Sequence, residues 1–123
     1  MASNKIVRIG PVALGTSAAN IANPPTVSGG VGLAGTNSAT YLIIRHLRLV
    51  NKTSSTQTAS LFIGASGASA SGTEFAFNGK QIFANDSADW YGLMRLDVAD
   101  FLTGIASAAN SITLEGEAEI GIV

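Results

Sequence analysis

The stretch SITLEGEAEIGIV, residues 111–123, alternates between apolar or small residues and polar residues. One parity holds the apolar and small side chains of Ile112, Leu114, Gly116, Ala118, Ile120 and Ile122. The other parity holds Ser111, Thr113, Glu115, Glu117 and Glu119. Because successive side chains of a strand point to opposite faces, this pattern predicts a long β-strand with one buried face and one wet face. Such one-sided strands are typical of antiparallel sheets, since a buried parallel sheet is apolar throughout.

Further strands are predicted wherever short β-branched or aromatic segments lie between Gly, Ser and Asn turns. These segments are residues 5–9, 12–14, 41–50, 57–63, 74–77, 80–83 and 88–96. Pro11 interrupts the first of them, and a proline donates no hydrogen bond to a sheet, so we expect this segment at a sheet edge or on a neighbouring subunit. Residues 41–50, YLIIRHLRLV, are apolar on both parities, which favours a central strand with both faces at least partly covered.

Two local patterns predict the connections in the second half of the chain. Asn78-Gly79 is the preferred pair for a type I′ turn, and it predicts a hairpin in which Phe75 faces Ile82. Residues 97–104 break the β pattern, with Asp97 as a candidate N-cap and Gly104 as a candidate residue after the last turn. We therefore expect one or two helical turns there.

Together these elements predict an all-β protein, an antiparallel β-sandwich of eight or nine strands with one short helix. A jelly roll is one form of such a sandwich. The length of 123 residues suits a single domain. We assign residues 41–123 to the sandwich body and residues 1–40 to an N-terminal strand followed by an extended arm or a long loop. Residues 16–40 show little periodicity, and their apolar content argues against a free solvated linker.

The composition favours a protein that assembles. Only 12% of the residues are charged, whereas an ordinary soluble domain has about 25%. Ala, Gly, Ser and Thr together make up 56 of the 123 residues. A surface with few charges and many small residues suits burial against copies or partners. The net charge of −1 and the absence of a basic stretch predict neither nucleic acid nor a membrane surface as partner.

No enzyme active site is predicted. There is no cysteine, and His46 is the single histidine, placed inside the most apolar strand, where a structural hydrogen bond is the favoured role. The aspartates near turns lack the spacing of a calcium loop. We therefore predict no catalytic residue, no cofactor and no metal. Of the adjacent Trp90 and Tyr91, one is expected in the core and the other on the surface, where it would offer a platform for a sugar.

The glutamate row of the closing strand is open to two interpretations. It forms either a solvated face or a match to basic residues on a neighbouring strand or subunit. The candidates for contacts between subunits are Arg45, Arg48, Glu115, Glu117 and Glu119.

Several stretches in order resemble small β-sandwich virion proteins of tailed bacteriophages. They are LVNKT at 49–53, LFIGASG at 61–67, GTE at 72–74, WYG at 90–92, LDVADFLTG at 96–104 and EAEIG at 117–121. The resemblance covers roughly residues 41–122, rests on packing and turn motifs, and is to the head decoration type.

The resemblance implies a capsid decoration protein. Such a protein self-associates as a homotrimer, binds the major capsid protein, stabilises the assembled head, and is located in the virion after assembly in the host cytoplasm. The alternatives are a neck, tail or fibre-associated virion protein, or a carbohydrate- or surface-binding β-sandwich module.

Overall fold

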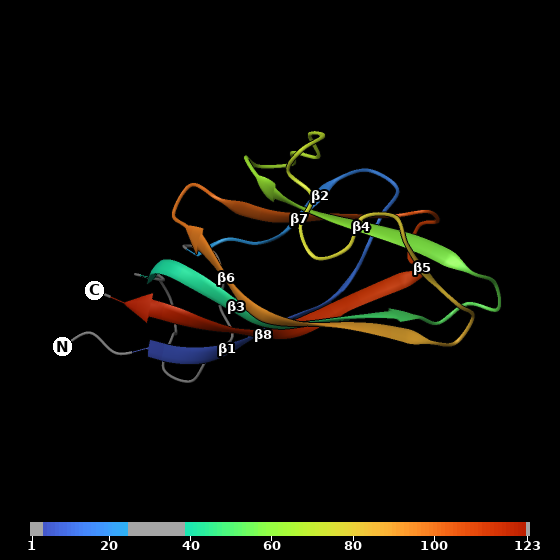
Figure 1. Cartoon of the computed structure of the whole chain (residues 1–123), viewed down its shortest axis with the longest axis horizontal. Helices are drawn as coiled ribbons and strands as arrows, with labels where there is room; N and C mark the ends of the chain where they lie inside the picture. Colours follow the sequence, from blue (N-terminus) through green and yellow to red (C-terminus); the bar gives the residue numbers. More distant parts are fainter. Residues whose placement is uncertain (1–3, 25–38, 123) are drawn as a thin grey trace.

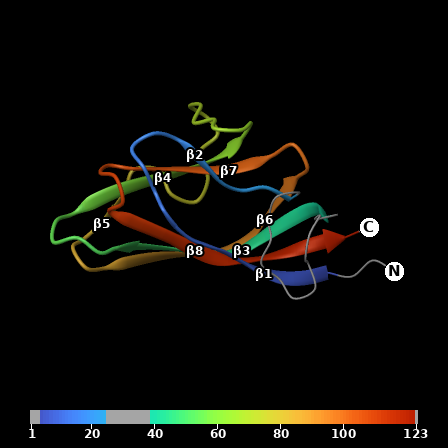
Figure 2. The ribbon, with the colours of Figure 1, turned by 180° about the vertical axis from the view of Figure 1, so that it is seen from behind.

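The computed structural model describes residues 4–24 and 39–122, which form two facing antiparallel sheets of four strands each (Figures 1 and 2). The strands of this described part are β1 Asn4–Ala13, β2 Ala19–Ala22, β3 Ala39–Asn51, β4 Gln57–Gly64, β5 Lys80–Ile82, β6 Ser87–Asp97, β7 Phe101–Ala106 and β8 Ile112–Ile122. The first sheet has the order β1-β8-β3-β6, and the second sheet has the order β2-β7-β4-β5. The predicted antiparallel β-sandwich is confirmed, and the strand order is that of a jelly roll.

The closing strand β8 lies in the middle of the first sheet, between β1 and β3. Its predicted inner parity is buried from Ile112 to Ile120, whereas the glutamates of the other parity are half-buried or exposed. The side chain of Ile122 and all of Val123 lie outside the described residues. Ile112, Leu114 and Ile120 pack in one core with leucines of the facing sheet, including Leu61 and Leu102. The alternation therefore predicted both the strand and its buried face.

Strand β3 is central, as predicted, and both of its faces are at least partly covered, since Tyr41, Ile43 and Val50 on the outer face are half-buried. A bulge is a second reason why its apolar residues occupy both parities. Between Ile44 and His46 the register shifts against both neighbouring strands. An extra residue in one strand turns the following side chains over to the other face. Leu42 and Ile44 before the bulge and Leu47 and Leu49 after it consequently all point into the core and are fully buried.

Strand β1 is the edge of the first sheet, as Pro11 predicted. Its pairing with β8 shifts register between Ile9 and Val12, and the Gly10-Pro11 peptide bond at the shift is cis. The residues predicted as arm or loop are described only in part. Residues 19–22 form β2, an edge strand that pairs with β7 in the second sheet, and residues 25–38 lie outside the described residues.

The predicted helix at residues 97–104 was wrong. β6 continues to Asp97, a tight turn follows, and β7 begins at Phe101. The two aspartates close this turn, since Asp100 N–H donates to the Asp97 carbonyl at 2.8 Å and Asp97 N–H donates to Asp100 Oδ2 at 2.9 Å. The same side-chain oxygens that cap helices also stabilise turns, so the local signal was ambiguous. Residues 101–106 instead pair as a strand with β2 and β4.

The predicted Asn78-Gly79 hairpin was also wrong. Both of its expected arms pair with β4 instead of with each other. Lys80–Ile82 forms β5 beside residues 57–59, and Phe75 exchanges backbone hydrogen bonds with the neighbourhood of Leu61, where its N–H donates to the Leu61 carbonyl at 2.8 Å. Ala76 adopts a left-handed backbone conformation, with φ of 67°, so Phe75 and Phe77 both turn into the core. Pairing with a long existing strand, and the burial of two aromatic rings, outweighed the local turn preference.

Candidate functional site on the outer face of the first sheet

The charges of the sandwich are segregated onto one sheet. Strands β2, β4 and β7 of the second sheet contain no charged residue, and β5 contributes only Lys80. The strands of the first sheet carry all four arginines of the chain, namely Arg8, Arg45, Arg48 and Arg95. They also carry five of the eight carboxylates, namely Asp89, Asp97, Glu115, Glu117 and Glu119.

Strand register arranges these side chains in rows across the outer face. One row places Glu117 of β8 between Arg8 of β1 and His46 of β3, and Tyr91 of β6 follows His46. The next row places Arg48 of β3 between Glu115 of β8 and Asp89 of β6. Directly opposite residues of an antiparallel pair lie about 5 Å apart, so charges of opposite sign are neighbours along both rows.

Asp89 is the centre of the best-ordered cluster on this face. Arg48 Nε donates to Asp89 Oδ1 at 2.8 Å, and His46 Nε2 lies 2.8 Å from the same oxygen. A carboxylate oxygen only accepts hydrogen bonds, so His46 Nε2 is the donor in this contact. The His46 ring stacks on Tyr91 with ring centroids 4.4 Å apart and planes at 6°. The predicted structural hydrogen bond of His46 is thus confirmed, and its partner is Asp89.

Replacement of Asp89 by asparagine is expected to remove a stabilisation that depends on pH. The hydrogen bonds from His46 and Arg48 lower the pKa of the folded Asp89 carboxyl below its ordinary value of 3.8. A lowered folded pKa contributes stability that is present above 3.8 and is lost as pH falls through the folded value. Because solvent screens these charges, the free energy of unfolding of wild type should exceed that of Asp89→Asn by less than about 1 kcal/mol at pH 7. Urea unfolding at pH 7 and at pH 2.5 measures the difference, which should be smaller at the lower pH; a constant difference would contradict this explanation.

The candidate contact residues are placed together on this face. Arg45 and Glu119 form an ion pair within the chain, with Nη1 3.5 Å from Oε2. Arg48 bonds to Asp89 and lies opposite Glu115 in the register. Glu115 and Glu117 line a shallow hollow of about 300 Å³ together with Arg8, His46, Arg48 and Gly116. Their contact with a neighbouring subunit stays a prediction.

The chemistry of this face is that of a polar contact surface. The described residues include no group of three or more His, Asp or Glu side chains placed to hold a metal ion. The hollow offers donors and acceptors of both signs, which suits a polar partner rather than one charged ligand. Among the same described residues no helix is long and apolar enough to cross a membrane.

The sequence alone did not identify Asp89 as the partner of His46. The two are 43 positions apart, and only the register of β3 against β6 brings them together. Their neighbours behave as the alternation predicts. Trp90 turns inward and meets Phe75 edge to face, with ring centroids 4.8 Å apart, whereas Tyr91 is 69% exposed.

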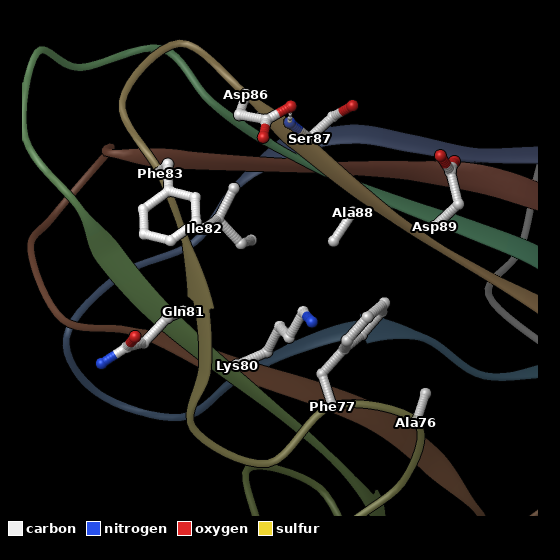
Figure 3. A pocket seen from close by; sticks show the side chains of 10 residues that line it. All are labelled: Ala76, Phe77, Lys80, Gln81, Ile82, Phe83, Asp86, Ser87, Ala88 and Asp89. Atoms are coloured by element: carbon white, nitrogen blue, oxygen red, sulfur yellow. Dashed lines mark hydrogen bonds between the residues drawn. The ribbon is translucent and has the colours of Figure 1, made fainter.

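A second hollow opens between the free edges of the two sheets. It has a volume of about 420 Å³ and lies between β5 and the start of β6. Figure 3 shows Phe77, Lys80 and Ile82 on one side of this opening and Ala88 and Asp89 on the other. Within residues 4–24 and 39–122, the sandwich is therefore open along the edge formed by β5 and β6.

Comparison with known proteins identifies no family. No protein-family model matches the chain, and no curated protein matches it. Among solved structures, a chain of desmodium yellow mottle tymovirus is similar with a TM-score of 0.46 and 13% sequence identity, covering 99% of this chain and 87% of that chain.

Proposed function

We propose that this protein is a non-enzymatic virion protein of a tailed bacteriophage, a capsid decoration protein that binds the assembled head through its second sheet. The segregation of charge carries the proposal. Strands β2, β4 and β7 have no charged side chain, so their outer side loses little solvation when a partner covers it. Depletion of charge is also what distinguishes the core of a protein interface from other surface.

The loop that follows β4 supports this choice of face. Residues 65–72, ASGASASG, fold over the outer side of the second sheet and are held there by side-chain bonds. Asn20 of β2 donates to Ser66 Oγ at 2.9 Å and accepts from Gly67 N–H at 2.7 Å. Thr103 of β7 donates to the Ala68 carbonyl at 2.6 Å. A loop that is already ordered loses less conformational entropy on binding, which suits this surface to docking. The loop itself has no charged residue, and the carboxylate next to it, Glu74, accepts from Gly72 N–H at 2.8 Å.

The proposed mechanism is stabilisation by mass action. A protein that binds the assembled shell but not its separated subunits lowers the free energy of the shell. The proposed partner is the major capsid protein, and a homotrimer would engage several capsid subunits at once, which adds avidity. The protein would reside in the virion, and particles would assemble in the host cytoplasm.

A cryo-EM map of the native particle tests this function directly. Decoration requires hundreds of copies on the head, with the second sheet turned towards the capsid. About a dozen copies at the neck would establish the neck or tail alternative instead. Absence of the chain from intact particles by mass spectrometry would refute a virion role.

Replacement of Ser69 and Ser71 by glutamate is expected to reduce particle occupancy. Both side chains are exposed on the loop of residues 65–72, so the folded monomer should keep its melting temperature. Burial of two unpaired carboxylates against a partner should weaken binding by at least about tenfold. Occupancy is measured by quantitative gel analysis of particles incubated with purified protein.

The matched control is Thr113→Glu, which adds a carboxylate to the charged outer face of the first sheet. It should bind particles as wild type does. Loss of binding by the control, with binding retained by the loop variant, would move the docking surface to the other sheet.

A further inference from the structure

Asn78 and Gly79 form an exposed asparagine–glycine pair in the bend that leads into β5. The sequence contains this pair once. Neither residue belongs to a strand, and the Asn78 side chain makes no hydrogen bond to the residues that the structure describes. Gly79 has a φ of 62°, and a Cβ built on it meets nothing within 4 Å. The Asn78 amide is therefore open to solvent, and no side chain crowds the backbone that follows it.

The pair carries an intramolecular reaction. The backbone nitrogen that follows an asparagine can attack the side-chain carbon Cγ, because the ring that forms has five members. A glycine favours this attack, since it has no Cβ beside the nitrogen and its backbone adopts many conformations. Asparagine counts among the thermolabile residues of proteins.

We propose that Asn78 is the preferred site of spontaneous deamidation in this chain and that the Ser60 hydroxyl slows the reaction. In the first step a bond forms between Gly79 N and Asn78 Cγ. The bond from Cγ to Nδ2 breaks, and ammonia leaves with the proton of the Gly79 nitrogen. Water then opens the ring on one side of that nitrogen or the other, which gives aspartate or isoaspartate. No group is oxidised or reduced, and the modification is independent of the proposed virion role.

Ser60 restrains the nitrogen that attacks. Gly79 N–H donates to Ser60 Oγ at 2.7 Å. The Ser60 side chain points away from the core, because its neighbours Ala59 and Leu61 on β4 are buried. The attacking nitrogen must give up its proton, and it would then lose this hydrogen bond. A bond to the protonated form disfavours loss of the proton, so Ser60 stabilises the unreactive amide.

Two other asparagines show why position 78 reacts first. Asn51 is 1% exposed, and both ends of its amide are held by hydrogen bonds. Asn110 is exposed, but Ser111 follows it, and the serine Cβ stands beside the nitrogen that would attack. Asn110 is therefore the suitable internal reference for the reaction rate.

The first test follows the folded full chain by mass spectrometry during incubation at mildly alkaline pH. Trypsin releases residues 53–80, in which Asn78 is the single asparagine, and residues 96–123, in which Asn110 is the single asparagine. Incubation in H₂¹⁸O labels ring opening that precedes digestion. The change from amide to carboxyl should accumulate at least about fivefold faster in residues 53–80, with isoaspartate detected by isoaspartyl methyltransferase. Equal rates in the two peptides would overturn the assignment of Asn78.

The second test removes the restraint. Ser60→Ala should speed deamidation of residues 53–80 by about fivefold, because one hydrogen bond to the attacking nitrogen is lost. The matched control is Thr58→Ala, which removes a hydroxyl two residues away on the same side of β4. The control should react as wild type does. An unchanged rate in Ser60→Ala, or equal acceleration by both variants, would refute the role of Ser60.

Amide hydrogen exchange tests the same bond without a change in stability. The Gly79 amide of wild type should exchange more slowly than an amide without a hydrogen bond, because the Ser60 hydroxyl holds its proton. Exchange of the wild-type Gly79 amide at the rate of an unprotected amide would overturn the proposed restraint.

The product of the reaction would add charge beside the second sheet. Strand β4 has no charged side chain, and deamidation places a carboxylate at position 78 next to it. An effect on particle binding rests on the proposed function, whereas the modification does not. Asn78→Asp should bind particles about threefold more weakly than the uncharged variant Asn78→Ser. Equal binding of these two variants, with weaker binding of the variant at Ser69 and Ser71, would refute this effect alone. Full binding of all three would refute the proposed docking face and leave the mass-spectrometric result standing.

Discussion

Replacement of Gly116 by alanine is expected to lower the free energy of unfolding by at least about 3 kcal/mol, because β3 leaves no room for a Cβ there. Gly116 lies in the middle of β8, opposite Leu47 of β3. A Cβ built on Gly116 collides with the backbone carbonyl oxygen of His46 and comes within 3.0 Å of the Leu47 side chain. The bulge in β3 begins next to His46, so relieving the collision would require the central strand pair to separate.

Urea unfolding followed by tryptophan fluorescence measures this effect, since Trp90 is packed on the core. The matched control is Gly15→Ala, where the nearest atom to an added Cβ is the Ser17 carbonyl oxygen at 3.9 Å. That variant should unfold as wild type does. Equal stability of Gly116→Ala and wild type would show that β3 has no bulge of this form.

Replacement of Asn51 by aspartate is expected to destabilise the fold by about 3 kcal/mol at pH 7. Asn51 is 1% exposed at the end of β3 and uses its whole amide. Nδ2 donates to the carbonyls of Ser55 at 2.9 Å and Ile82 at 2.8 Å, which links the first sheet to β5 of the second. Oδ1 accepts from Thr53 N–H at 2.9 Å and Thr53 Oγ1 at 2.7 Å. An aspartate would turn a carboxylate oxygen towards two carbonyl oxygens, without any donor.

The pH dependence separates this cause from a general loss of packing. Burial would raise the pKa of the introduced carboxyl, so the penalty should shrink as pH falls towards 4 and the group becomes neutral. The same change at exposed Asn78 is the matched control and should alter stability by less than about 0.5 kcal/mol. A penalty for Asn51→Asp that is the same at pH 4 and pH 7 would contradict the proposed hydrogen-bond origin.

Predictions from the sequence succeeded for features that depend on one strand alone, such as which of its faces is buried. The alternation from Ile112 to Ile120 predicted a strand and its buried side, and Pro11 predicted an edge. Periodicity is local, so it needs no knowledge of the partner strand. The side-chain roles of Trp90 and Tyr91 followed for the same reason, since adjacent residues of a strand point to opposite faces.

Predictions failed where two alternatives were locally close in energy. Asn78-Gly79 suits a tight hairpin, but its flanking segments pair with β4, and Phe75 and Phe77 enter the core. Asp97 and Asp100 suit a helix start and a turn equally well, and the pairing of the following residues with β2 and β4 favours the turn. Tertiary burial decided both cases because it exceeds the small difference in local preference.

The candidate site depended on tertiary structure more than the fold did. Arg45, Arg48 and the three glutamates were recognisable as a charged set because they lie on two strongly patterned strands. The pairing of His46 with Asp89 could not be recognised from the sequence, because it requires the register of β3 against β6. The bulge after Ile44 also decided which of the β3 residues face outward.

The glutamate row of β8 shows which features the sequence determines and which features depend on the tertiary structure. The sequence by itself determined that Glu115, Glu117 and Glu119 share one face of a long strand, because side chains alternate with a period of two in any strand. Only the tertiary structure decided that Arg8, Arg45, His46 and Arg48 lie around them, and that the second sheet is left almost without charge. Alternation is a property of one strand, whereas charge placement depends on strand order, register and bulges, which arise from contacts between distant residues.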